Sequence, residues 1–192
     1  MEIWLITSVW RRSSRSFLNL VKKLFVYILI VVLAVFAAGL FGVVHNQVSY
    51  TVAPEYFTKF KFRRFGLTDA PLPERVRASM VGFLASWWMG IPIGLLVDAV
   101  GFIHRGHRRM LRVSLWALLV AVGFTLLFGL GGLLYGYLQT AHINVAEYRG
   151  WFIPADVTDL RRFLCAGYMH NSSTSAECLP FWWLGRFILS YG

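Results

Sequence analysis

Three long apolar runs, separated by shorter polar stretches, dominate the pattern along this chain. They cover Leu24–Val44, Ser79–Ile103 and Val113–Tyr137 and hold 21, 25 and 25 residues by inclusive count. A helix needs about 20 mostly apolar residues to cross the hydrocarbon core of a bilayer. Asp98 is the only charged residue within the three runs. The pattern therefore predicts an all-α membrane protein, a bundle of three transmembrane helices.

The segment before the first run, residues 1–23, has the pattern of a basic amphipathic helix. Its apolar positions recur at helical spacings, with basic residues interleaved at Arg11, Arg12, Arg15, Lys22 and Lys23. A helix of this kind lies in the membrane interface, where its cations meet anionic lipid head groups. The alternative for this segment is a disordered basic tail.

The distribution of positive charge predicts an orientation for a multi-pass protein. Residues 1–23 and the basic loop at residues 104–112 lie on one side, since two spans separate them, and hold nine Lys or Arg in 32 positions. The other side holds ten, spread over far more of the chain. Because basic residues favour the cytoplasmic side, this density predicts a cytoplasmic N-terminus. We expect Arg105, Arg108 and Arg109 to contact lipid head groups as well.

Composition agrees with a single membrane domain and changes how the charge is interpreted. The 192 residues are 57% hydrophobic, and the formal net charge is +10. Such a charge would suggest nucleic acid as the partner of a soluble protein. Here the cations cluster beside the spans, so the bilayer and its anionic lipids are the expected partners, and nucleic acid is not.

The loop at residues 45–78, on the predicted outer side, alternates apolar and polar positions. The alternating apolar residues are Val48, Tyr50, Val52, Phe60 and Phe62. Alternation with a period of two predicts strands, and the Ala53-Pro54-Glu55 stretch offers a turn. We therefore expect a short outer β-hairpin with a basic, aromatic face.

The outer tail at residues 138–192 carries a predicted helix and a second apolar segment. Asp156 is a candidate N-cap for a helix that runs to about Tyr168. The segment Leu179–Tyr191 would span about 20 Å as a helix, which is short of the roughly 30 Å hydrocarbon core. We expect an interfacial or re-entrant segment there. The alternative is a fourth span that starts inside the preceding helix.

The two cysteines, Cys165 and Cys178, both fall in this tail. Oxidising compartments permit disulfides, so the predicted outer location favours a bond between the two. The alternative is two unrelated thiols, one of them packed as a small hydrophobe.

Small residues recur four positions apart in all three spans. They are Ala34, Ala38 and Gly42 in the first, Gly90 and Gly94 around Pro92 in the second, and Gly132 and Gly136 in the third. Such stripes let helix backbones approach closely, either within one chain or between copies.

Asp98 is the candidate for an ion pathway, because a carboxylate within a span is a functional hypothesis by default. The alternatives are a structural ion pair with Arg105 or Arg108 and simple exposure at the interface.

Three histidines, His45, His142 and His170, fall on the predicted outer side near span ends. With Glu55 or Glu147 they are candidate ligands of a transition metal, and His45 with His142 is a candidate axial haem pair. They lack a ligand-spacing signature, so the favoured alternative is interfacial histidines that bind backbone or lipid phosphate, with no cofactor.

No phosphate-binding glycine loop, CxxC pair or nucleophile with its base stands out, so the sequence does not predict an enzyme. The leading hypothesis is an accessory or scaffold subunit, acting as a homo-oligomer or with a membrane-protein partner. The alternatives are a small transporter or channel that uses Asp98, and a metal- or haem-binding redox component that uses the outer histidines.

The stretch His45–Phe62 resembles one in small, uncharacterised bacterial polytopic membrane proteins, and His170-Asn171-Ser172 is similar to a stretch near their C-termini. In those proteins the latter leads into a final apolar span. This chain departs from that pattern where Glu177 and Arg186 interrupt the apolar run. The resemblance implies a bacterial inner-membrane location and brings no known activity.

Overall fold

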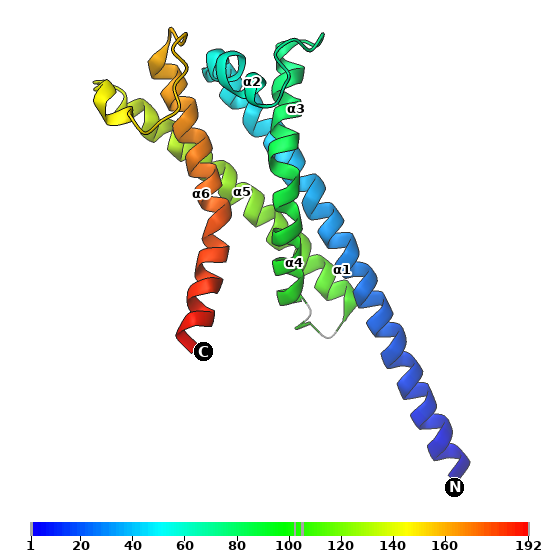
Figure 1. Cartoon of the computed structure of the whole chain (residues 1–192). Helices are drawn as coiled ribbons and strands as arrows, with labels where there is room; N and C mark the ends of the chain where they lie inside the picture. The colour runs from blue at the N-terminus through cyan, green and yellow to red at the C-terminus, as the bar shows by residue number, and fades with distance from the viewer. Residues whose placement is uncertain (1, 102, 105, 192) are drawn as a thin grey trace.

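The computed structural model describes the backbone of residues 2–101, 103–104 and 106–191, and side chains of residues 17–100, 103–104, 106–176 within them. All elements in this part of the chain are helical. They are α1 (Glu2–Val52), η1 (Tyr56–Lys61), α2 (Phe62–Arg64), α3 (Glu74–Ser86), η2 (Trp87–Met89), α4 (Gly90–Gly101), α5 (His107–Gln139), η3 (Val145–Tyr148) and α6 (Leu160–Tyr191). Figure 1 shows the long helices side by side, with η1 and α2 at one end of the bundle. We call this end the η1 end.

Three helical stretches are long and apolar enough to cross a membrane, which confirms the predicted multi-pass class. They are Phe17–Val52, Glu74–Val100 and His107–Gln139. The first includes eight residues beyond the predicted limit at Val44, because no helix breaker occurs before Pro54. The buried residues His45 and Ser49 lie in this extension, four positions apart as on one face of a helix.

The predicted basic helix at residues 1–23 is continuous with the first span. α1 is one helix of 51 residues, with no break between the two segments (Figure 1). The side chains of Arg11, Arg12 and Arg15 lie outside the described residues.

The second span changes geometry near its middle. α3 leads into η2, a 3₁₀ turn, and α4 follows with Pro92 in its first turn. Proline fits there because the first turn of a helix does not use its backbone N–H groups. The indole of Trp88 donates to the Ala85 carbonyl at 2.8 Å, which satisfies that nitrogen at the junction.

The small-residue stripes form contacts between helices of the same chain. A methyl group added at Gly42 would overlap the Gly82 carbonyl, so α1 and α3 touch through their backbones. One added at Gly90 would overlap the α1 backbone at Ala34 and Val35. On the other side of the bundle, one at Gly132 would overlap Ser172, which closes α5 onto α6.

The predicted β-hairpin is wrong. No strand occurs among the described residues, and the segment after α1 folds as η1, a π-helix, followed by the short helix α2. The aromatic residues that alternate in the sequence are packed into a core instead, where Phe57 and Phe62 are fully buried beside Phe163 of α6. Tertiary burial of these rings outweighs the strand propensity of the pattern.

A glycine ends this helical segment. Gly66 has φ of 67°, in the left-handed region that favours glycine. The Leu67 amide donates to the Phe62 carbonyl at 2.8 Å and the Gly66 amide to the Arg63 carbonyl at 3.3 Å. These two bonds form a Schellman motif, the common glycine-dependent helix end.

The tail after α5 contains a single long helix. α6 has 32 residues, about 48 Å of helix, and joins the two segments that the sequence suggested separately. Its N-cap is Asp159, whose carboxylate accepts from the Arg162 amide at 3.0 Å, and not Asp156 as predicted. In Figure 1 α6 runs along α5 from the η1 end towards the end where α1 begins. A continuous helix is what the alternative of a fourth span requires, but α6 is not among the stretches of the described chain that are long and apolar enough to cross, so that span stays a prediction.

The predicted disulfide does not fit this helix. Cys165 is a buried free thiol, and the side chain of Cys178 lies outside the described residues. Positions thirteen residues apart on one continuous helix are separated by about 20 Å, whereas a disulfide requires Cα atoms within about 7 Å.

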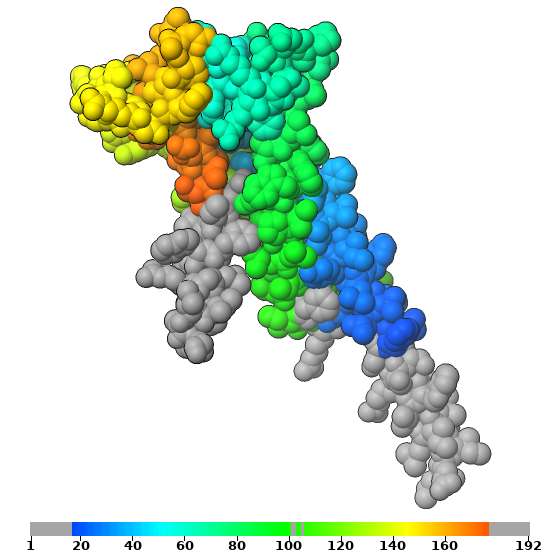
Figure 2. Space-filling model, in the orientation of Figure 1, coloured from blue at the N-terminus to red at the C-terminus, as the bar shows by residue number. Residues whose placement is uncertain are grey.

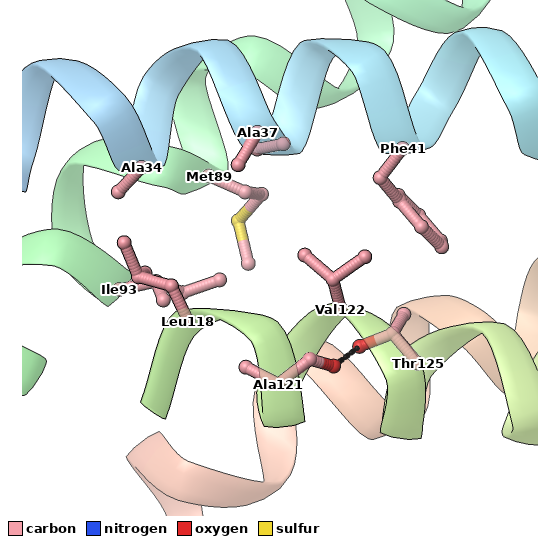
Figure 3. A pocket seen from close by; sticks show the side chains of 10 residues that line it. Ala34, Ala37, Phe41, Met89, Ile93, Leu118, Ala121, Val122 and Thr125 are labelled. Atoms are coloured by element: carbon pink, nitrogen blue, oxygen red, sulfur yellow. Dashed lines mark hydrogen bonds between the residues drawn. The ribbon is translucent and has the colours of Figure 1, made fainter. Parts of the chain in front are cut away.

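Between α1, α4 and α5 the packing leaves a small apolar gap of about 30 Å³ (Figure 3). Ala34, Met89 and Leu118 face it, and the Thr125 hydroxyl that borders it donates to the Ala121 carbonyl at 2.9 Å. With its polar atom already bonded, this gap offers a water little to bind. It is a packing feature of the bundle and not a ligand site.

Candidate ligand-binding cavity

A much larger cavity, of about 600 Å³, lies at the η1 end where α1, η1, α3 and α6 meet. We call it the histidine cavity. Its polar lining is His45, Asn46, Lys61, Arg64, Ser86, His170, Asn171, Ser173 and Thr174, and its aromatic lining is Phe41, Tyr56, Phe60, Phe65 and Trp88. Figure 2 shows a hollow in the surface between α3 and α6, beneath the segment that carries α2. The volume is typical of small-molecule sites.

Two histidines hold α1 and α6 together in the wall of the cavity. The Nε2 atom of His45 lies 3.0 Å from the Ser173 hydroxyl, and that of His170 lies 3.1 Å from the Ser49 hydroxyl. Each helix thus contributes one imidazole and one hydroxyl, and the two rings meet edge to face with centroids 4.7 Å apart. Helical spacing explains the arrangement, because His45 and Ser49 are one turn apart on α1 and His170 and Ser173 nearly one turn apart on α6.

The close approach of α5 leaves no space behind this pair. A methyl group at Gly129 would overlap the Ser173 hydroxyl and lie 3.3 Å from the His45 ring. On the cavity side, Tyr56 stacks on His170 at 5.0 Å with an interplanar angle of 22°. The rings are therefore fixed by their neighbours, and the wall is preorganised.

Lys61 is one of the two cations that line the cavity. Its ammonium lies 5.5 Å from the ring centre of Tyr56 and 5.6 Å from that of Phe60. Among the described residues it has neither a hydrogen-bonding partner nor a carboxylate partner. Burial, with a smaller effect from the nearby Arg64 cation, lowers the pKa of Lys61 to about 8.

The cavity is positive because its cations lack counter-charges. Lys61 and Arg64 both line it, and none of the described lining residues is acidic. Two acids at the same end of the bundle are paired with other cations: Glu55 with Lys59 at 2.5 Å and Asp156 with Arg63 at 2.6 Å. An anion placed in the cavity would therefore meet two unpaired cations in a partly dry environment.

Glu55 ties η1, the roof of the cavity, to the start of α6. Its carboxylate accepts from the backbone amides of Thr158 and Asp159, both at 2.9 Å, and from the Thr158 hydroxyl at 2.6 Å. Together with the hydrogen bond from Lys59, these bonds lower the pKa of Glu55 to about 2. The roof is thus fixed from α1 on one side and from α6 on the other.

The chemistry available to this arrangement is the binding of an anion. Cations, an amide from Asn171 and hydroxyl groups surround one space, and aromatic faces cover its sides. The Ser173–His45 distance would also allow the imidazole to accept the serine proton. None of the described residues lining the cavity is a carboxylate that could orient the imidazole, so binding is the better-supported chemistry.

The predicted three-histidine metal site does not form. His142 is exposed in the segment after α5, away from the other two histidines in the cavity wall. Among the described residues no group of three or more His, Cys, Asp or Glu side chains is placed to hold a metal ion. With His142 exposed, the predicted axial pair of His45 and His142 does not face one common space either.

Asp98 is buried far from the cavity, between α4 and α5. Its Oδ1 accepts from the Ser114 hydroxyl at 3.5 Å, and its Oδ2 is buried with no hydrogen-bonding partner among the described residues. Arg108 is exposed and does not pair with it, while Arg105 lies outside the described residues. The expected ion pair with Arg108 is therefore not formed, and the ion-pathway hypothesis stays a prediction.

The other expected lipid contacts lie at the end of the bundle away from η1. Lys22, Arg108 and Arg109 are exposed there, as contact with head groups requires, and Lys23 is partly buried.

Comparisons with known proteins add nothing to this geometry: no family model, curated protein or solved structure matches the chain. The resemblance to small bacterial polytopic proteins stays a prediction.

Sequence reasoning found two residues of the cavity, His45 and His170, and missed the serines that bind them. The signal was present, because Ser49 follows His45 by four residues and Ser173 follows His170 by three. It becomes visible only once both segments are assigned to helices. Lys61 lies in the segment predicted as a hairpin with a basic, aromatic face, so the sequence did not predict that it lines a cavity.

Proposed function

We propose that this chain is an integral membrane protein that binds an anionic group, of the phosphate or carboxylate class, in the histidine cavity. The observation that carries the proposal is Lys61, a cation without a counter-charge that faces a space free of acidic side chains in the described lining.

Three other cations at the η1 end have the counter-charge that Lys61 and Arg64 lack. Lys59, Arg63 and Arg77 each pair with a carboxylate within 4 Å. A buried cation without such a partner costs free energy, and a bound anion would remove that cost. The contrast supports a ligand as the missing counter-charge of Lys61.

The test is anion binding by the purified protein in detergent, measured by calorimetry with pyrophosphate and citrate as probes. A charge-assisted hydrogen bond contributes about 1.5–3 kcal/mol, so Lys61→Met should weaken binding about tenfold to hundredfold. Arg149→Met is the matched control, because Arg149 is exposed on the segment after α5 and does not line the cavity.

Lys61→Arg should retain binding and shows that the fold tolerates a change at this position. If the wild-type protein binds neither probe in preference to chloride, or if the Lys61→Met and Arg149→Met variants bind equally well, the proposal is wrong.

The earlier hypotheses differ in their present support. The roles as an accessory subunit and as a transporter using Asp98 stay predictions, as do the cytoplasmic N-terminus and the inner-membrane location. The small-residue stripes no longer support an interface between copies, since Gly42, Gly90 and Gly132 are all covered within one chain.

A further inference from the structure

We infer that the anionic group is the head group of a membrane phospholipid, which reaches the histidine cavity sideways between α3 and α6. This inference rests on the function proposed above and names the class of ligand.

The lining of the cavity changes from charged to apolar along the bundle. Lys61 and Arg64 belong to η1 and α2, outside the three stretches that can cross a membrane. Leu84 and Trp88, which also line the cavity, belong to the second of those stretches. The two cations thus lie at head-group depth. The α3 side of the deeper lining offers apolar surface from Leu84 and Trp88, with the uncharged Ser86 between them. This order, charge first and apolar surface deeper, matches a phospholipid from its phosphate to its acyl chains.

The apolar wall is shared with the bilayer. Leu84 is 47% exposed and Trp88 is 52% exposed, although both border the cavity. Exposed faces of a membrane-spanning helix contact lipid, so one side of these residues faces acyl chains and the other faces the cavity.

The helices on either side of the opening are supported separately. α3 packs on α1, and α6 packs on α5, with little contact between α3 and α6. Figure 2 shows the resulting hollow between them, and Figure 1 shows η1 and α2 above it. A route between the two helices leads from the bilayer to the cavity without displacing either of the packed pairs.

The roof makes access from water the less direct route. Glu55 fixes η1 to Thr158 and Asp159, and Arg63 pairs with Asp156 across the same junction. The size of the cavity also favours a lipid head group over a small soluble anion. At about 600 Å³ it exceeds a phosphate ion, which occupies only a few times the roughly 30 Å³ of a water molecule. A phosphodiester head group with the start of its chains uses more of that space.

The experiment compares three soluble probes on the detergent-solubilised protein by calorimetry. They are dihexanoyl phosphatidylglycerol, dihexanoyl phosphatidylcholine and glycerol phosphate, and each is titrated below its micelle concentration. We expect the anionic lipid to bind at least tenfold more tightly than either of the others. Lys61→Met should remove that preference, and Lys61→Arg should keep it.

A second variant tests the route. Ala85→Trp places a large ring in the wall between Leu84 and Ser86, both of which line the cavity. It should weaken binding of the anionic lipid at least fivefold and leave that of glycerol phosphate within twofold. Thermal unfolding of each variant, compared with the wild type, identifies one that has lost its fold and removes it from the comparison. Phosphatidylglycerol with brominated chains should quench wild-type fluorescence more than that of Trp88→Phe.

The outcomes separate the two proposals. If glycerol phosphate binds in a Lys61-dependent way and the lipid binds no better, this inference fails and the anion-binding function stands. If none of the probes depends on Lys61, both fail. Equal binding of the anionic and zwitterionic lipids would indicate non-specific surface lipid and would also overturn the inference.

Discussion

Lys61 shows how the surroundings of one residue set its behaviour. Its ammonium is desolvated and faces several titratable or charged groups: Tyr56 on η1, Arg64 on α2, His45 on α1 and His170 on α6. None of these is an acid that would hold the proton on Lys61 at high pH. The pKa of Lys61 is therefore about 8, well below the ordinary value for lysine.

This sets a pH dependence for the proposed binding. The ammonium that attracts an anion is present below the pKa and is lost above it, so affinity should fall as the pH rises through about 8. A phosphodiester probe keeps one charge over this range, which isolates the lysine. Calorimetry at a series of pH values measures the effect. Lys61→Arg should flatten the profile, because a guanidinium stays protonated; a decline of the same size in that variant would assign the titration to another group.

Asp98 permits a prediction of the opposite kind, in which removing a charge stabilises the protein. Within the described part of the chain its Oδ2 is buried without a partner, which costs free energy, and its Oδ1 is bonded only to Ser114. Asp98→Leu should raise the thermal unfolding temperature by a few degrees. In that variant the Ser114 hydroxyl can bond to a backbone carbonyl of its own helix. A lower unfolding temperature, measured by scanning fluorimetry in detergent, would mean that the carboxylate has a stabilising partner.

Among the helices, the contact between α5 and α6 depends on the absence of side chains. A methyl group at Gly132 would meet Ser172 and the backbone of Tyr168, whereas one at the adjacent Gly131 would meet nothing within 4 Å. The same substitution at neighbouring positions thus has opposite effects on packing.

Gly132→Ala should lower the unfolding temperature, because the helices must separate to admit the methyl group. Gly131→Ala should leave it unchanged or raise it, since alanine favours a helix over glycine by about 1 kcal/mol. Thermal unfolding in the same detergent measures both. Equal changes in the two variants would contradict the tight α5–α6 packing.

The helices also show which elements of this fold could be predicted from the sequence. Length and composition sufficed for the three spans, because the bilayer demands a long apolar helix whatever its partners. The alternation at residues 48–62 misled the prediction of a hairpin, because rings that alternate in sequence also fit a helix whose partners bury them unevenly. Phe57 and Phe62 are buried by Phe163, a residue about a hundred positions away that a local pattern does not contain.

At the scale of the molecule, the sequence did not predict the cavity, because its walls are formed by residues far apart along the chain. Its two histidine–serine bonds join residues 121 and 128 positions apart. They require α1 to extend past Val44 and α6 to cross it at one particular height. The histidines of the predicted metal site were selected because all three fall on the same predicted side of the membrane. That criterion included His142, which is not in the cavity wall, and did not consider Lys61, which is. Two residues can be in contact only if they lie on the same side of the membrane, but lying on the same side does not mean that they are in contact.

The single, unbroken α6 has a consequence for how the polypeptide is threaded through its membrane. If this helix crosses, the number of crossings is even, and residues 2 and 191 face the same compartment, as their positions in Figure 1 suggest. Compartment-sensitive reporters fused before residue 2 and after residue 191 should then give the same signal. One inserted beside Gly66, which has open space around it, should give the opposite signal. Opposite signals from the two terminal fusions would mean an odd parity, with α6 lying against the bilayer surface.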